Sequence, residues 1–444
     1  MSEPSSGHGQ RTGRRGGSKG GSKGGSKGGV RRRAPYRDRR PDRAAGPWLG
    51  HEFEVEIGPV AHGGHCVARH EGRVVFVRHA LPGERVRVRV TEDGGGSYCR
   101  ADAVAVVLAS ADRVRPPCEY AGPGGCGGCD WQHASADAQR ELKASVVREA
   151  LARLGGLPDV DVTVQPLPGG LLGWRTRLQL AVDGAGRVGL RRHRSHDVEL
   201  IDHCPLATDE VNAVDAPARL WPDAAVVEVV ASTGGQTAVL ETPRGSAAPR
   251  VTGPAVLTER AAGRDWRVSA GGFWQVHPEA ASALAACVLD LLQPAPGEAV
   301  LDLYAGAGLF AGVLAGRVGV TGRVLAVEAD PTAAADARAN LAPYPAAAVH
   351  HGVVEAFVAS DPPKFPQPDL VVLDPPRAGA GPATVAAVCA LAPRAVAYVA
   401  CDPAALARDV RAAGGHGYRL VDLRAFDLFP MTHHVECVAL LEPA

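Results

Sequence analysis

The chain has few aromatic residues, no long apolar run and no net charge. Aromatic residues make up 5% of its 444 residues, methionine occurs twice, and Lys+Arg equal Asp+Glu at 48 each. No stretch approaches the roughly 18 consecutive apolar residues of a membrane-spanning helix, and no apolar signal-peptide core begins the chain. We therefore expect no membrane association and a cytoplasmic location. In that reducing compartment, clustered cysteines indicate metal binding or catalysis rather than disulfides.

The balanced total charge hides a basic N-terminal segment. Residues 1–45 hold thirteen Lys/Arg and three Asp/Glu, a net charge of +10, so the other 399 residues carry −10. Gly-Ser-Lys recurs there and apolar residues are few, which predicts a disordered arm without a core. Such an arm either binds nucleic-acid phosphates without reading sequence or is a solvated leader with no specific role.

Two regions of different texture follow the arm. Residues 48–110 contain short alternating strands, which predict a small β-barrel; these strands cover 53–57, 73–77, 85–90 and 104–108. Arg85, Arg87 and Arg89 share one face of their strand, and that face is either an RNA surface or a solvated edge protected by charge. Residues 111–270 predict an α+β central domain. It contains a cysteine-rich segment, a helix over 134–154 and strands over 174–182 and 187–190.

Residues 271–444 alternate short apolar strands with alanine-rich helices, which predicts an α/β fold with a doubly wound parallel sheet. The expected strands cover 299–303, 323–327, 370–373, 395–399 and 435–441. Ligands bind such sheets outside the carboxyl ends of the strands. Cys401 and Asp374 both follow strands and so are expected at that edge.

A glycine-rich loop, Gly306-Ala307-Gly308, follows the strand that contains Asp302. Glycines let a ligand approach the backbone at a helix N-terminus, and Glu328 ends the next strand, where an acid can bind both hydroxyls of a ribose. The loop also fits a dinucleotide fingerprint, so NAD or flavin competes with S-adenosylmethionine. Asp374-Pro375-Pro376 favours S-adenosylmethionine, because such a strand end is familiar in methyltransferases that act on nucleobases.

Three cysteines within twelve residues indicate a metal site. Cys118, Cys126 and Cys129 are spaced C-x7-C-x2-C, and Cys204 is the candidate fourth ligand. Four thiolates can hold an iron–sulfur cluster or tetrahedral zinc, and the spacing does not separate the two.

Two C-terminal motifs carry a family resemblance. With them, the chain resembles the bacterial RNA 5-methyluridine (uracil-C5) methyltransferases, in particular the branch with a TRAM domain and an iron–sulfur cluster that modifies 23S ribosomal RNA. The motifs are Tyr398-Val399-Ala400-Cys401-Asp402-Pro403 and Phe426-Asp427-Leu428-Phe429-Pro430-Met431-Thr432-His433-His434-Val435-Glu436. The resemblance implies a Rossmann-like class I methyltransferase domain, an N-terminal TRAM/OB-like β-barrel and the α+β central domain.

The resemblance also implies roles for single residues. Cys401 would be the nucleophile, with a depressed pKa, and Glu436 the general base. Contacts to S-adenosylmethionine would come from Gln275, Tyr304, Glu328 and Asp374, and a [4Fe–4S] cluster, favoured over zinc, would be held by Cys118, Cys126, Cys129 and Cys204. The substrate would be RNA, ribosomal rather than transfer RNA, and the protein a monomer.

The chain departs from the family pattern at three places. The first cysteine gap is longer than usual, Leu309 replaces a polar residue, and Asp402 follows the nucleophile where asparagine is usual. The alternatives are a transfer-RNA uridine-C5 methyltransferase, an exocyclic-amine methyltransferase, a non-catalytic RNA-binding protein with the same fold, and a flavin or NAD oxidoreductase.

Overall fold

The computed structural model describes residues 46–246, 248–360, 365 and 367–444. The predicted basic arm therefore lies outside the described residues. None of the helices among these described residues combines the length and the apolar character that a membrane span requires.

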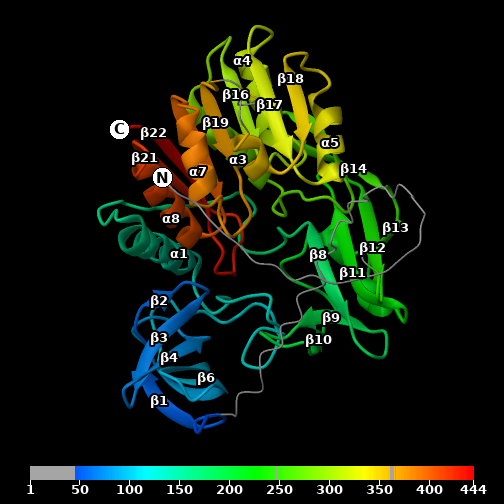
Figure 1. Ribbon diagram of the computed structural model, residues 1–444. Helices are drawn as coiled ribbons and strands as arrows, with labels where there is room; N and C mark the ends of the chain where they lie inside the picture. Colours follow the sequence, from blue (N-terminus) through cyan, green and yellow to red (C-terminus); the bar gives the residue numbers. More distant parts are fainter. Residues whose placement is uncertain (1–45, 247, 361–364, 366) are drawn as a thin grey trace, which may run out of the picture. The chain divides into compact units, whose positions relative to one another are not determined.

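The first region is a six-stranded sheet with the strand order β1-β5-β6-β4-β3-β2 (Figure 1). Its strands are β1 (Glu52–Glu56), β2 (Val60–Ala61), β3 (His65–His70), β4 (Arg73–Arg78), β5 (Arg85–Asp93) and β6 (Tyr98–Leu108). In β5 the valines point into the core while the arginines are exposed, as the alternation predicts. This barrel domain contains every strand expected there.

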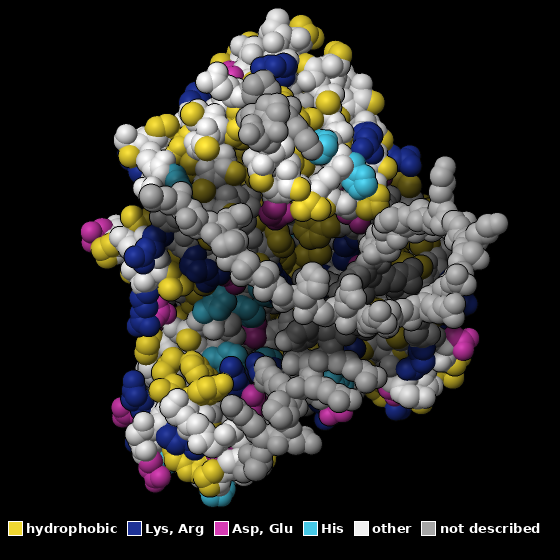
Figure 2. Space-filling model, in the orientation of Figure 1, with side chains coloured by type: hydrophobic (Ala, Val, Ile, Leu, Met, Phe, Trp, Pro, Cys, Tyr) yellow, Lys and Arg dark blue, Asp and Glu magenta, His cyan; other side chains and the backbone are white. Residues whose placement is uncertain are grey.

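The three exposed arginines of β5 are not free cations. Arg89 lies 2.6 Å from Glu52 on β1, Arg87 lies 3.5 Å from the same carboxylate, and Arg85 lies 4.0 Å from Glu54. In Figure 2, basic and acidic side chains are likewise interspersed on the face shown. The sequence pattern could not reveal this pairing because β1 and β5 are far apart in the chain. Strand β5 lies between β1 and β6, so its arginines are not on a sheet edge as the protected-edge interpretation requires, and Glu52 and Glu54 balance part of their charge.

The middle region contains a helix and a separate antiparallel sheet. Helix α1 (Ala136–Ala150) continues into a π-helical turn, η1 (Leu151–Gly155), which together match the predicted helix. The sheet has the order β10-β9-β8-β11-β12-β13, and a hairpin of β14 (Val256–Ala261) and β15 (Arg264–Ser269) follows it. The sheet strands are β8 (Arg177–Val182), β9 (Val188–Arg191), β10 (Val198–Leu200), β11 (Ala224–Ala231), β12 (Thr237–Pro243) and β13 (Arg250–Thr252). Two short helical segments, α2 (Asp209–Asn212) and η2 (Ala216–Ala218), connect β10 to β11.

The C-terminal region is a sheet of order β18-β17-β16-β19-β20-β22-β21-β7 with helices on both faces (Figure 1). Its strands are β16 (Ala299–Leu303), β17 (Arg323–Glu328), β18 (Ala347–His351), β19 (Leu370–Leu373), β20 (Ala395–Ala400), β21 (Tyr418–Asp427) and β22 (Glu436–Pro443). The helices are α3 (Ala280–Leu292), α4 (Leu309–Val318), α5 (Pro331–Leu341), α6 (Val354–Val358), α7 (Pro382–Ala390) and α8 (Pro403–Gly414). Strand β22 pairs antiparallel with both of its neighbours, whereas the other described pairs of this sheet are parallel. The predicted doubly wound α/β fold is confirmed.

Part of the middle region belongs to this sheet. Strand β7 (Val164–Pro166) pairs parallel with β21 at the sheet edge. Ala144 and Val147 of α1, with Leu151 of η1, share a buried cluster with Leu406 and other residues of the C-terminal region. Residues from the predicted central domain therefore contribute an edge strand and a covering helix to the C-terminal sheet. The domain boundaries at residues 110 and 270 stay predictions.

Candidate active site

The chemically active residues gather at one edge of the C-terminal sheet. Strands β17, β19 and β20 are parallel, so Glu328, Asp374 and Cys401 lie at or directly after their carboxyl ends. Strand β22 runs the other way, and the register pairs Ala400 with Cys437. The first residue of β22, Glu436, is thereby brought to the same edge as Cys401.

A cavity of about 970 Å³ opens at this edge. All six residues predicted for catalysis and cofactor contact line it: Gln275, Tyr304, Glu328, Asp374, Cys401 and Glu436. Further lining residues include Phe273, Arg377, Phe429 and His434. The structure thus brings together residues that are as much as 161 positions apart in the sequence, from Gln275 to Glu436. A cavity of this size accommodates a cofactor and a second ligand.

The glycine-rich loop is held in a left-handed conformation above the sheet. Tyr304, Gly306 and Gly308 have φ values of 63°, 54° and 88°. A Cβ on Gly308 would lie 3.3 Å from the Ala337 side chain, so the loop packs closely on α5. The backbone N–H of Gly306 donates to Glu328 (2.8 Å). The loop and the acidic end of β17 are therefore fixed to each other.

Asp302 is a buried acid below the loop. It was not among the site residues predicted from the sequence. Its Oδ2 accepts the N–H of Ala311 at 2.7 Å, while its Oδ1 has no partner. Burial raises the pKa of Asp302 to about 8, with smaller contributions from Asp374 and Glu328. Burial also raises the pKa of Asp374, to about 7. Both carboxyl groups therefore hold protons at unusually high pH in the ligand-free protein.

The proposed nucleophile and base lie in a low-polarity wall of the cavity. Burial, followed by the nearby Glu436, raises the pKa of the Cys401 thiol to about 11, and Arg377 opposes this rise. Burial and the neighbouring Asp374 raise the pKa of Glu436 well above its ordinary value, with Arg377 again opposing. The expectation of a depressed Cys401 pKa is wrong for the ligand-free protein, because desolvation and the surrounding acids outweigh the effect of Arg377.

The segment that precedes Glu436 is anchored by residues of the middle region. Met431 has a φ of 68°, its N–H donates to Gln139 of α1 (2.7 Å), and its carbonyl accepts the N–H groups of Asp130 and Trp131. The Asp130 carboxylate also accepts from the N–H of His433 (3.1 Å) and lies 2.7 Å from His433 Nδ1.

A buried ion pair secures the start of the same segment. Lys143 of α1 is fully buried, and its Nζ lies 2.5 Å from Asp427 and 3.0 Å from the carbonyl of Phe429. Sequence reasoning missed Lys143, since a lysine in a polar stretch of helix usually faces solvent. The signal in the sequence for a buried cation was its partner Asp427, which lies in the C-terminal motif of residues 426–436.

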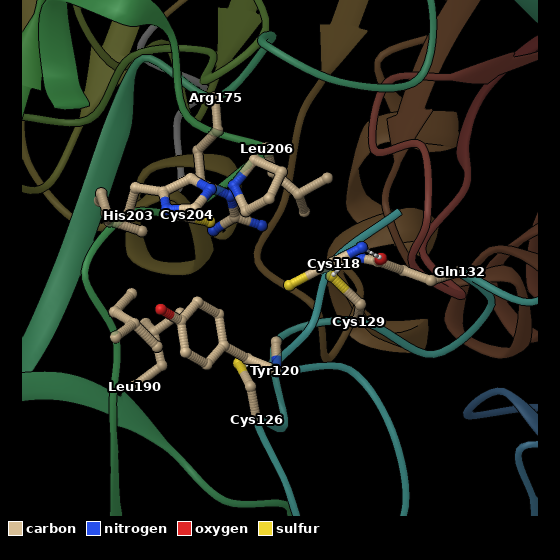
Figure 3. Close-up of a pocket in the computed structure, with 14 residues that line it drawn as sticks. Cys118, Tyr120, Cys126, Cys129, Gln132, Arg175, Leu190, His203, Cys204 and Leu206 are labelled. Carbon is tan, nitrogen blue, oxygen red and sulfur yellow. Dashed lines mark hydrogen bonds between the residues drawn. The ribbon is translucent and has the colours of Figure 1, made fainter. Parts of the chain in front are cut away.

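The four predicted metal ligands share a second, smaller cavity of about 50 Å³ (Figure 3). It is lined by Cys118, Cys126, Cys129 and Cys204, with Tyr120, Arg175 and His203 among its other walls. Burial raises the pKa of the Cys129 thiol to about 12, against a hydrogen bond from Gln132. Within the described residues, no three Cys, His, Asp or Glu side chains have the arrangement of a metal site. The thiols are neighbours but do not converge on one point.

Comparisons with known proteins agree with this arrangement. The family model "TRAM domain" matches residues 49–104, and "tRNA (Uracil-5-)-methyltransferase" matches residues 365–444. A third model, "Protein-L-isoaspartate(D-aspartate) O-methyltransferase (PCMT)", matches residues 275–356, which include the glycine-rich loop.

Two relatives match over nearly their full lengths. An "Uncharacterized RNA methyltransferase" of Streptomyces avermitilis is 52% identical over 431 residues, covering 89% of this chain and 99% of the relative. A "23S rRNA (uracil(1939)-C(5))-methyltransferase" of Alkalilimnicola ehrlichii is 34% identical, covering 88% of this chain and 96% of the relative. The fold is similar to that of a Pyrococcus abyssi tRNA (uracil-54, C5)-methyltransferase solved with S-adenosyl-L-homocysteine, with a TM-score of 0.67, 23% identity and coverage of 87% of this chain and 100% of that one.

Proposed function

Since this chain belongs to the S-adenosylmethionine-dependent RNA uracil-C5 methyltransferases, we propose that it methylates C5 of a uridine through a covalent bond between Cys401 and the base. The observation that carries this proposal is the joint placement of Cys401 and Glu436 at one edge of the sheet, in a cavity with the glycine-rich loop. An exocyclic-amine methyltransferase needs no thiol there.

The covalent step solves a chemical problem of the substrate. C5 of uracil is a poor nucleophile, but addition of the Cys401 thiolate to C6 moves electron density onto C5. C5 then takes the methyl group, the donor sulfur keeps the electron pair of the broken S–CH3 bond, and Glu436 accepts the proton that C5 loses. The electrons of that C–H bond restore the C5–C6 double bond and expel Cys401 as thiolate.

Arg377 is the residue that favours the charged forms needed for this chemistry. The free site holds the Cys401 thiol protonated, because burial and Glu436 raise its pKa to about 11. Arg377 is the cation that acts against this rise for both Cys401 and Glu436. We assign it the role of stabilising the thiolate and the carboxylate during the reaction.

The cavity residues suit S-adenosylmethionine. Glu328, at the end of β17, would bind the ribose, and Tyr304, Gln275 and Asp374 would complete the pocket around the donor. When bound, the donor supplies an electrophilic methyl group on a positively charged sulfur.

We propose ribosomal RNA as the substrate and a monomer in the bacterial cytoplasm as the working form. The support for ribosomal RNA is the 34% identity to a relative whose name specifies 23S ribosomal RNA. Transfer RNA is the second candidate. Mapping 5-methyluridine in ribosomal and transfer RNA from a deletion strain tests this: loss confined to ribosomal RNA supports the proposal, and loss confined to transfer RNA contradicts it.

We also propose that Cys118, Cys126, Cys129 and Cys204 hold a [4Fe–4S] cluster. The support is the chemistry of the donors alone, because four thiols line one small cavity and soft sulfur ligands suit iron–sulfur clusters; the described thiols do not already have the arrangement of a metal site. Such a cluster would serve as a structural element that fixes the cysteine-rich segment. Iron and acid-labile sulfide measured in protein purified without oxygen test the assignment, and stoichiometric zinc in place of iron contradicts it.

The central experiment traps the covalent adduct. RNA containing 5-fluorouridine cannot lose its C5 substituent as a proton, so wild-type protein is expected to accumulate a complex stable to denaturant. Cys401→Ala should form none, and Glu436→Gln should form the adduct with ordinary RNA but release product slowly. Methylation by Cys401→Ala at the wild-type rate would overturn the mechanism.

A further inference from the structure

One turn of the barrel domain contacts both the segment that contains Cys401 and the segment that leads to Glu436. This turn joins β2 to β3 and consists of His62, Gly63 and Gly64. On one side, His62 Nε2 lies 3.3 Å from Oδ2 of Asp402, the residue after Cys401. On the other side, the turn packs on His433, three residues before Glu436.

The packing on the Glu436 side is tight. Gly64 has a φ of 80°, and a Cβ there would lie 2.9 Å from the His433 Cβ. The Gly64 carbonyl also accepts a hydrogen bond from the indole N–H of Trp131 (3.1 Å). The turn is therefore fixed in place independently of His62.

Asp402 connects the turn to the nucleophile. Its Oδ1 accepts the N–H of Ala405 at 2.8 Å and so caps helix α8, while Oδ2 faces His62. The two oxygens thus tie the residue beside Cys401 to the helix and to the barrel domain.

We propose that His62 is a positioning residue: its ion pair with Asp402 holds the β20–α8 junction so that the Cys401 sulfur is aligned for attack on the base. The inference rests on the proposed nucleophilic role of Cys401. It gives the barrel domain a part in the chemical step, in addition to any part in holding RNA.

Two groups on the methyltransferase side act on the charge of His62. The hydrogen bond to Asp402 raises the pKa of His62 above its ordinary 6.5, against partial burial and Arg408. The pair is therefore ionic at lower pH and loses its charge as the pH rises through the raised pKa. A positioning effect of His62 should follow the same dependence.

The expected effect is modest because solvent reaches the pair. The side chains of His62 and Asp402 are 51% and 24% exposed. Removal of a partly exposed ion pair should therefore slow adduct formation by about 3- to 5-fold rather than abolish it.

The test compares His62→Ala and His62→Gln with wild type in single-turnover adduct formation on 5-fluorouridine RNA, at about pH 6 and about pH 9. Asp402→Asn is the matched partner variant, because asparagine still caps a helix but lacks the charge. His51→Ala, an exposed histidine on the same domain, is the control. At the lower pH, we expect the His62 variants, Asp402→Asn and the double variant His62→Ala with Asp402→Asn to form the adduct at the same reduced rate. At the higher pH, the rates of all these variants should approach that of wild type.

Separate outcomes identify which idea fails. An unchanged rate in His62→Ala at both pH values, or a loss that lies wholly in RNA affinity, overturns the positioning role. A rate deficit that is the same at both pH values also overturns it, since an uncharged contact would suffice. Adduct formation by Cys401→Ala instead overturns the proposed nucleophile itself.

Discussion

Replacement of Lys143 by methionine should reveal how the active-site segment is held. Lys143 Nζ is fully buried between Asp427 (2.5 Å) and the carbonyl of Phe429 (3.0 Å). Methionine fills a similar volume but leaves the buried Asp427 carboxylate without its cation. Loss of one partner of a buried ion pair costs about 3–5 kcal/mol, a large share of the roughly 5–15 kcal/mol that stabilises a typical domain.

Urea unfolding of three variants measures this cost. Lys143→Met should lower the free energy of unfolding by about 3–5 kcal/mol, and Lys143→Met with Asp427→Asn should recover at least half of that, because no unpaired charge is left. The single variant should also form the RNA adduct more slowly, since Phe429 lines the catalytic cavity. A loss below about 1 kcal/mol, or no recovery in the double variant, would refute the assignment of an energetically coupled pair.

Three further predictions concern protons and thiols. Asp302→Asn should stabilise the fold by about 2–5 kcal/mol near pH 8 but little near pH 4. The reason is that the pKa of Asp302 is about 8 in the folded protein and 3.8 ordinarily, so ionisation of this carboxyl group opposes folding as the pH rises. Thermal melts across this pH range test the prediction, and an equal effect at both pH values contradicts it. Alkylation of Cys401 by iodoacetamide in the ligand-free protein should have a pH midpoint near 11, lower in Glu436→Gln, because Glu436 raises the thiol pKa; an unshifted midpoint in that variant contradicts the coupling. Cys204→Ser should reduce the iron content of purified protein while leaving the binding of S-adenosylmethionine measurable by calorimetry; full iron retention removes Cys204 from the proposed ligand set.

The central parallel strands of the sheet could be predicted almost residue by residue, whereas β18, β21 and β7 were not expected. Strands over 299–303 and 370–373 were expected with the bounds that the structure has. These strands are buried on both faces, so each is a continuous apolar run that stops where the chain reaches the sheet edge. The same fact explains why Asp374 and Cys401 could be assigned to one site: all parallel strands deliver their carboxyl ends to one edge.

The protonation states could not be predicted in this way. A motif identifies Cys401 as a thiol at a strand end, but its pKa depends on how much water reaches it and on which charges surround it. Asp374 and Arg377 follow β19, whereas Glu436 begins β22 about sixty residues later, and only the fold sets the balance of these charges around the sulfur. The same holds for the arginines of β5. The sequence shows that they alternate with valines, but it does not show that they pair with acidic residues of β1.

The middle region was hard to interpret because its important residues are defined by distant contacts rather than by local periodicity. Asp130 and Trp131 follow Cys129 directly, and their N–H groups meet the Met431 carbonyl at 2.9 and 3.0 Å. Gln139 binds the other side of the same residue at 2.7 Å. The cysteine-rich segment, helix α1 and the segment that leads to the catalytic carboxylate therefore form one hydrogen-bonded unit. Any group that orders the four thiols also restrains this unit, since the anchor of Met431 begins one residue after a proposed ligand.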